Sequence, residues 1–279
     1  MNSGLFGAPA AVQSVSGYEP DRALTGHLPA VRSTGGEDGG VTTERAARVW
    51  AWIAAAHEGD APVSIDALCR AAARRLGVDG ASVAVMSSPA ASEPLFASDE
   101  VSARLEELQF ATGEGPCADD FRFGSPMLIP DLGSVAARWP VFVPAAAAAG
   151  AGAMFAFPLQ AGAIRVGVLS MYRRQPRPLA PEELANVLVF ADIARQLLLD
   201  SSAGISASPD YEPLGGLSDS RAEVYQATGM ISVQLGVSLE EALVRLRARA
   251  FAVSAAVGDV AGEVVARQLR FDPDLGPEI

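Results

Sequence analysis

The sequence predicts an α+β domain, with a central antiparallel sheet and flanking helices, followed by a small three-helix bundle. Up to residue 200, segments with strand-type alternation are interleaved with segments of helical periodicity, and two strand segments within 152–172 follow each other directly. Beyond residue 218, helical periodicity continues and no strand pattern appears. The 279 residues are 49% apolar, which is enough for a substantial core and for one to two domains.

Composition restricts the classes of function. All 21 basic residues are arginines, and with 33 acidic residues the net charge is -12. This charge argues against binding nucleic acid over the whole surface but leaves room for a local basic face. The N-terminus lacks the features of a signal peptide, and no run of about eighteen apolar residues predicts a membrane span. We therefore expect a cytoplasmic protein with no membrane partner, and two widely spaced cysteines suit a reducing compartment.

The first part of the chain predicts a tail and two helices. Residues 1–40 are rich in Gly, Pro, Ser and Thr, so we expect a disordered tail before the α+β domain of residues 41–200. Helical periodicity begins in 41–59 and resumes in 64–77, where Ser64 occupies the expected N-cap. One face of the second helix carries Ile65, Leu68, Cys69, Ala72 and Leu76. This spacing predicts that Cys69 is a small core residue.

The middle of the domain alternates between strands and helices. We expect a strand in 80–87, an amphipathic helix in 98–110, a strand in 126–130 that ends at Pro130, and a helix in 139–150 that ends at its glycine.

A hairpin and a long helix complete the domain. Strand patterns in 152–160 and 163–172 are joined at Ala161-Gly162, which predicts an antiparallel hairpin. The following helix, 181–200, opens with proline and two acidic residues. Its Leu184, Ala191 and Leu198 repeat every seven residues and predict a seam for a partner helix, which supports a homodimer.

Residues 201–218 are a linker by composition, and residues 219–271 form the predicted bundle. Two capping-box patterns, Ser220 with Glu223 and Ser238 with Glu241, predict the starts of its first two helices. A C-terminal tail of 272–279 follows. Three helices of this size are near the lower limit for folding alone.

Two family resemblances cover most of the chain. Residues 41–200 resemble a GAF domain, a small-molecule sensor fold, through the stretches GEGPCADDF, RWPVFVP and FAFPLQAGAIRVGVLSMY. Residues 219–271 resemble an ANTAR domain through QATGMISVQLGVSLEEALVRLRARAF and VGDVAGEVVARQL. The resemblance implies a transcription antitermination regulator in which a GAF domain senses a small molecule or a redox signal and an ANTAR domain binds hairpin RNA.

The second resemblance implies a set of RNA-binding residues: Gln226, Gly229, Arg245, Arg247 and Arg249. Arg245 and Arg249 are four residues apart and share one helix face, and guanidinium groups suit phosphates and unpaired bases. A glycine inside a helix costs about 1 kcal/mol relative to alanine, so Gly229 predicts a close approach to a neighbour. Residues 219–271 contain six arginines and six acids. This balance favours the alternative, in which the bundle serves dimerisation or protein docking.

The candidate sensing residues are Cys117, Trp139, Phe155 and Phe157. Cys117 follows Gly115-Pro116, where a thiol near a helix N-terminus can be redox-responsive, and the alternative is a small packed residue. The aromatic residues can line a ligand cavity or belong to the core. The sequence contains no recognisable catalytic motif and no metal-ligand spacing, so we expect no enzyme. The ligand and any cofactor are not encoded in a motif.

Overall fold

The computed structural model describes residues 38–57, 63–202 and 217–272. The α+β part contains α1 (Asp38–Ala56), α2 (Ile65–Arg75), β1 (Gly80–Ser88), β2 (Ala91–Ala97), α3 (Glu100–Thr112), α4 (Pro116–Phe123), β3 (Met127–Ile129), η1 (Leu132–Val135), α5 (Phe142–Ala148), β4 (Ala153–Ala161), β5 (Ile164–Arg173) and α6 (Pro181–Ser202). The bundle contains α7 (Leu217–Leu235), α8 (Leu239–Ala252) and α9 (Val257–Val265). Most of the predicted tail, linker and C-terminal tail lies outside the described residues.

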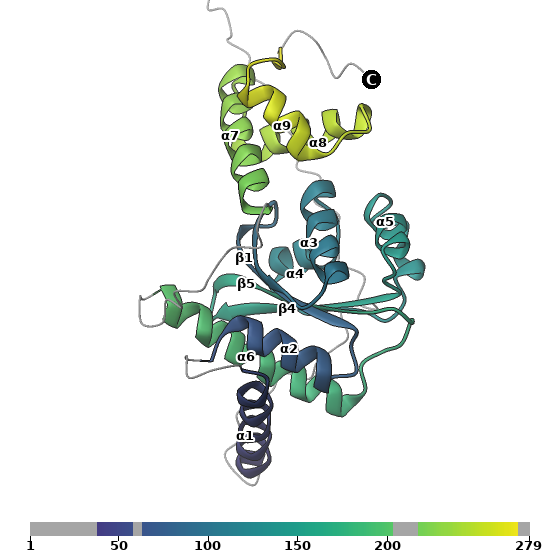
Figure 1. Cartoon of the computed structure of the whole chain (residues 1–279), viewed down its shortest axis with the longest axis vertical. Helices are drawn as coiled ribbons and strands as arrows, with labels where there is room; N and C mark the ends of the chain where they lie inside the picture. The colour runs from purple at the N-terminus through teal and green to yellow at the C-terminus, as the bar shows by residue number, and fades with distance from the viewer. Residues whose placement is uncertain (1–37, 58–62, 203–216, 273–279) are drawn as a thin grey trace, which may run out of the picture.

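The sheet is antiparallel, and its strands follow the order β2-β1-β5-β4-β3. Helices α2 and α6 cover one face, and α3, α4 and α5 cover the other, while α1 packs against the outer side of α2 and α6 (Figure 1). The bundle lies beyond α3 at one end of the molecule (Figure 1). Within the described ranges, no helix is long and apolar enough to cross a membrane.

The predicted hairpin is confirmed. β4 pairs with β5 from Ala153 opposite Arg173 to Ala161 opposite Ile164, and Gly162 in the turn has φ +61°. Successive β4 side chains alternate between the two apolar clusters that lie on opposite faces of the sheet. The hairpin therefore connects both halves of the core.

Strand β2 was missed by the sequence reading. Its sequence, ASEPLFA, contains a glutamate and a proline and has no clear alternation. The structure places it at the edge of the sheet, where Pro94 is tolerated because only one side of the strand is paired. An edge strand of this composition is recognised by its pairing with β1 and not by its own pattern.

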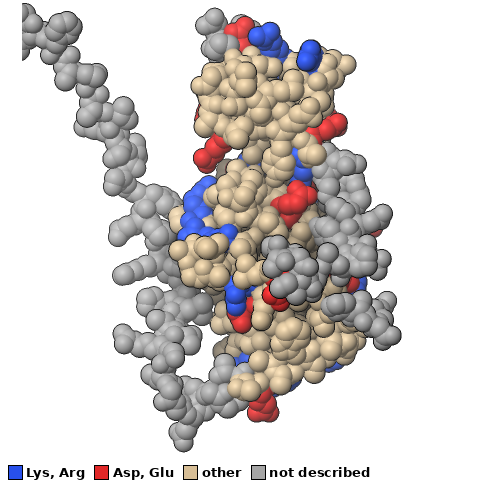
Figure 2. Space-filling view, turned by 90° about the vertical axis from the view of Figure 1, so that its left-hand side faces the viewer, with Lys and Arg blue, Asp and Glu red and all other residues tan. Residues whose placement is uncertain are grey.

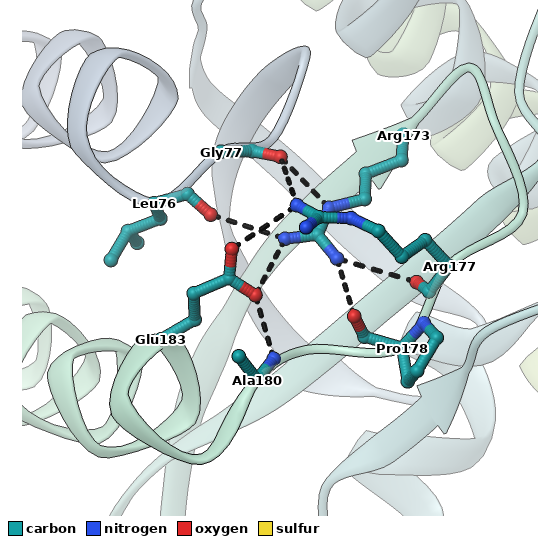
Figure 3. Close-up of polar contacts among 7 residues, drawn as sticks. All are labelled: Leu76, Gly77, Arg173, Arg177, Pro178, Ala180 and Glu183. Atoms are coloured by element: carbon teal, nitrogen blue, oxygen red, sulfur yellow. Dashed lines mark hydrogen bonds and ion pairs between the residues drawn. The ribbon is translucent and has the colours of Figure 1, made fainter.

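The buried side chain of Arg173 connects the end of β5 to the segments around it (Figure 3). Its guanidinium donates to the carbonyl oxygens of Gly77 (2.8 Å) and Pro178 (2.6 Å), with further bonds to those of Leu76 and Arg177. It also pairs with Glu183 at 2.9 Å, in the first turn of α6. Arg173 thereby satisfies carbonyl groups of two loops that have no strand or helix partner.

The heptad positions of α6 pack against other elements of the same chain. Ala191 and Leu198 are buried in the cluster formed with α1, α2 and the sheet, and Leu184 packs against it. The interpretation of these three residues as an exposed seam for a second copy is therefore wrong. Homodimerisation stays a prediction that must use other surfaces.

The bundle has the predicted three helices, with two differences at α7. This helix begins at Leu217, so Ser220 lies inside it and the first predicted capping box is wrong. The second predicted capping box is supported, because the Ser238 Oγ accepts a hydrogen bond from the Glu241 backbone amide at 3.2 Å. Gly236 ends α7 in the left-handed conformation, with φ +65°. A Cβ added at Gly229 would meet nothing within 4 Å among the described residues, so none of these makes the expected close approach.

Candidate functional site

A cluster of polar side chains is buried between the sheet and the helices α3 and α4. The Ser82 hydroxyl of β1 donates to the Glu106 carboxylate of α3 at 2.7 Å. One turn further along α3, Gln109 accepts from the Cys117 backbone amide at 2.8 Å, and its own amide lies 3.2 Å from the Cys117 sulfur. Burial raises the pKa of the Glu106 carboxyl, while the Ser82 hydrogen bond and the charge of Arg221 act in the opposite direction.

Asp120, in the middle of α4, is an unusual member of this interior. Its exposed fraction is 0%, and neither carboxylate oxygen has a hydrogen-bond partner among the described residues. Burial raises the pKa of this carboxyl well above its ordinary value, and the charge of Arg165 only partly offsets the effect. Arg165 instead donates to the carbonyl oxygens of Phe121 and Arg122. Asp120 is therefore a buried acid whose neutral form is favoured.

The neighbouring Asp119 has the opposite environment. Its carboxylate accepts from Arg122 (3.0 Å), Arg138 (2.8 Å) and the Trp139 indole (3.2 Å). These bonds connect α4 to the segment before α5. Trp139 is thus held by a hydrogen bond as well as by apolar packing.

The interior is closed in this structure. Ser82, Ser102 and Ser170 border a void between α3 and the sheet that is too small for a water molecule. A larger cleft of about 640 Å³ lies outside this interior, between α3 and α8. It is lined by residues of both helices, including Leu108, Arg104, Val244 and Phe251.

Two arginines of the bundle contact the α+β part. Arg221 of α7 donates to the carbonyl oxygens of Ser92 and Glu106, and its guanidinium carbon lies 4.2 Å from the centre of the Phe110 ring. Arg247 of α8 lies 5.5 Å from the same ring and donates to the Ala90 carbonyl oxygen at 3.3 Å. Burial lowers the pKa of Arg247 to about 10, with the charge of Arg221 acting in the same direction and Tyr225 opposing.

The comparison with protein-family models agrees with this architecture. Residues 63–198 match the family model described as GAF domain. Residues 63–198 form a GAF domain. No protein with a curated description matches the chain.

Solved structures that resemble the chain include two GAF domains of phosphoenolpyruvate-protein phosphotransferases. The one from Coxiella burnetii is 13% identical, covers 60% of this chain and 98% of its own, and has a TM-score of 0.45. The one from Acinetobacter is 12% identical, covers 59% of this chain and 96% of its own, and has a TM-score of 0.43.

The four predicted sensing residues do not line a common cavity. Cys117 and Trp139 belong to the apolar cluster on the α3–α4 face of the GAF sheet, whereas Phe155 and Phe157 belong to the cluster on the α1–α2–α6 face. All four residues are buried in these clusters, and their part in ligand sensing stays a prediction. Alternating residues of a strand point to opposite faces, so both phenylalanines point away from Cys117.

The sequence reading missed the polar residues of α3. Ser102, Glu106 and Gln109 are spaced as i, i+4 and i+7, so they occupy one stripe of the helix, and all three are buried. A polar stripe of this kind on the inward side of an otherwise amphipathic helix is a signal that sequence inspection can find. Such a stripe indicates that the polar side chains make defined hydrogen bonds inside the domain and do not face solvent.

Cys117 is 5% exposed, and burial raises the pKa of its thiol well above the usual value. A protonated, buried thiol is a poor nucleophile, which argues against a redox role in this closed state. We expect alkylation of Cys117 in the native protein to be at least ~100-fold slower than after denaturation. Mass spectrometry of iodoacetamide-treated protein measures this ratio. Buried Cys69 is the internal reference, and rapid native labelling of Cys117 alone would contradict the expectation.

Proposed function

We propose that the chain is an RNA-binding transcription antitermination regulator whose GAF domain senses a signal and whose three-helix bundle binds hairpin RNA. The supporting observation is the arrangement of α8. Arg245 and Arg249 lie one turn apart, while Leu243, Leu246 and Ala250 of the same helix are buried in the bundle. The resemblance of residues 219–271 to an ANTAR domain supplies the expected partner.

The state of Arg245 is compatible with binding phosphate, and Arg249 is half-buried on the same side of the helix. Arg245 is exposed and pairs with Glu241 at 2.7 Å across one helical turn. Such a pair on a helix surface contributes only about 0.3–0.5 kcal/mol, so RNA phosphate can displace the glutamate. On the face shown in Figure 2, most of the bundle surface is uncharged, basic and acidic side chains both lie at its outer end, and further acidic side chains lie on its flanks. This face carries no broad basic surface, so the proposed contact with nucleic acid is local.

The side of α7 that carries Gln226 and Gly229 supports an approach by a partner backbone. Gln226 is exposed, and the open space at Gly229 leaves the helix backbone accessible there. A helix interior glycine lowers stability relative to alanine, and no packing within the described chain requires it. A partner that approaches α7 closely is a reason for this glycine.

The double substitution Arg245→Glu with Arg249→Glu tests the proposal. We expect it to lower the affinity for a terminator-spanning hairpin RNA by about 100-fold or more, because two attractive phosphate contacts become repulsive. The salt dependence of binding should weaken by roughly 0.7 in slope for each lost contact to looped RNA. Gel-shift titrations at several salt concentrations measure both effects.

A matched control is Arg267→Glu with Arg270→Glu, which makes the same change in net charge at two other exposed positions of the bundle. If only the α8 variant loses binding, the contact is local to α8. An unchanged RNA affinity together with a lower melting temperature would show instead that Arg245 and Arg249 stabilise their helix.

A second candidate function is dimerisation or protein docking through α8. This helix exposes three large apolar side chains, Leu239 (61%), Val244 (50%) and Phe251 (71%). Val244 and Phe251 border the same cleft, and neighbouring exposed apolar groups favour protein contacts. No binding of hairpin RNA by the wild-type chain, together with a dimer in light scattering that Phe251→Ser dissociates, would favour this function.

A further inference from the structure

We propose that Phe110, Arg221 and Arg247 form a releasable latch that docks the bundle on the GAF domain and withholds both arginines from an anionic partner. The proposal rests on the proposed function, because it names how the GAF domain controls the RNA-binding surface. Arg247 is one of the residues expected to contact RNA, and in this structure it is occupied by the GAF domain. Docking and RNA contact through Arg247 are therefore mutually exclusive.

The latch has a defined centre. Phe110 is the only described residue of the GAF domain that is buried in the apolar cluster of the bundle. Both guanidinium groups lie against its ring, and Tyr225 of α7 contacts it edge-on at 6.0 Å between ring centres. Cation–π contacts that are shielded from water are the stronger ones. Removing this one ring should remove most of the attraction.

The arginines are only partly compensated in the docked state. Arg221 is 1% exposed, yet the ion pair that it makes within the described ranges, with Glu107, spans 3.6 Å. Among the described residues Arg247 makes no ion pair, and the Nε atoms of both arginines are buried without an acceptor. Burying charge without full pairing is costly. The guanidinium groups of Arg221 and Arg247 therefore gain hydration, or phosphate partners, when the bundle separates from the GAF domain.

Packing beside the latch is incomplete as well. The cleft of about 640 Å³ between α3 and α8 separates the two parts on one side of Phe110. Interfaces between domains of one chain that are small and partly polar resemble transient protein interfaces. The interface is thus suited to opening without unfolding either part.

Helix α3 connects the latch to the interior of the GAF domain. Glu106 accepts from Ser82 inside the domain through its side chain, and its backbone carbonyl accepts from Arg221 at 3.4 Å. Phe110 lies one turn further along the same helix, next to Gln109, which holds Cys117. A signal that shifts the interior contacts of α3 therefore moves the residues that hold Arg221.

Two full-length variants open the latch by different means. Phe110→Ala removes the ring, and Phe110 belongs to neither core cluster of the GAF domain. Glu107→Arg places a like charge beside Arg221 at a position that is partly exposed, so it tests the same contact without removing an apolar side chain. Phe251→Ala is the matched control, since it removes an exposed ring that borders the cleft.

The first measurement is modification by an arginine-specific dicarbonyl reagent, followed by mass spectrometry without RNA. We expect Arg247 to be protected in the wild type and modified roughly tenfold faster in both latch variants. Arg245, which is exposed in the docked state, is the internal standard and should not change. The second measurement is the affinity for hairpin RNA, which should rise by a similar factor in the latch variants.

The possible outcomes distinguish failure of the latch proposal from failure of the proposed RNA-binding function. If Arg247 reacts as fast as Arg245 in the wild type, or stays protected in both variants, the latch is wrong. If Arg247 becomes reactive while wild type and variants bind RNA equally tightly, docking does not control RNA binding and the proposal is overturned. If Arg247 becomes reactive and no form binds RNA, the latch is supported and the RNA-binding function is rejected.

Discussion

Asp120→Asn is expected to raise the free energy of unfolding at neutral pH by about 2 kcal/mol. The wild-type carboxyl is buried without a hydrogen-bond partner among the described residues. Its ionised form is costly in this apolar environment, so folding at neutral pH requires the carboxyl either to ionise there or to keep its proton. An amide has no charge and avoids this cost. Urea titrations monitored by circular dichroism measure the difference.

The pH dependence of this effect has a defined sign. The folded pKa of Asp120 is raised above its ordinary value of 3.8, so the folded and unfolded states bind this proton unequally only between 3.8 and the folded pKa. As pH rises past 3.8, the unfolded chain releases this proton first, and the wild-type protein loses stability until the folded pKa is reached. Asp120→Asn should remove this loss, so its advantage grows with pH over the same window.

Asp119→Asn is the matched control, because it makes the same chemical change at the adjacent residue. Asp119 accepts from Arg122, Arg138 and Trp139, so losing its charge should destabilise the protein. Opposite signs for the two variants would support the contrast in environment. A destabilising effect of Asp120→Asn would show that its carboxylate has a partner.

The second large effect is expected for Arg173→Met, which should destabilise the GAF domain by about 3–5 kcal/mol. Methionine preserves much of the length of the side chain but cannot donate to the carbonyl oxygens of Gly77, Pro178 and Leu76 (Figure 3). The carbonyl oxygens of Pro178 and Leu76 would be left without this donor, that of Gly77 would keep only the long bond from Arg177 at 3.5 Å, and Glu183 would lose its buried partner. The melting temperature and the urea midpoint report the loss.

Arg177→Met provides the comparison for this network. Arg177 pairs with the same Glu183 at 3.1 Å, but its side chain is 56% exposed. Exposed ion pairs contribute about 0–1 kcal/mol, so we expect a change of less than about 1 kcal/mol. Equal losses for Arg173→Met and Arg177→Met would contradict the view that burial sets the contribution of Arg173.

Much of the fold follows from local pattern. The helices α2, α3, α6 and α8, the strand β1 and the β4–β5 hairpin lie where periodicity and turn residues predict them. The Ser238 cap and the helix-ending Gly236 follow from their own chemistry. These features depend on residues within a few positions of one another, which is why a single sequence contains them.

Features that depend on a distant partner were not predicted. Strand β2 exists because β1 pairs with it, and the heptad positions of α6 are covered by α1 and α2 and not by a second chain. The polar stripe of Glu106 and Gln109 becomes a buried cluster only when α3 packs on the sheet. Periodicity identifies the face of a helix but does not say what lies opposite.

The arginines of α8 show the same limit most clearly. Their spacing alone places Arg245 and Arg249 on one face and Arg247 on its flank, and it predicts a basic helix. Only the tertiary structure distinguishes the exposed Arg245 from Arg247, which packs on Phe110 of the GAF domain. Arg247 and Phe110 are far apart along the chain. Their contact arises because the bundle folds back onto α3, so it follows from docking and not from any local preference of α8.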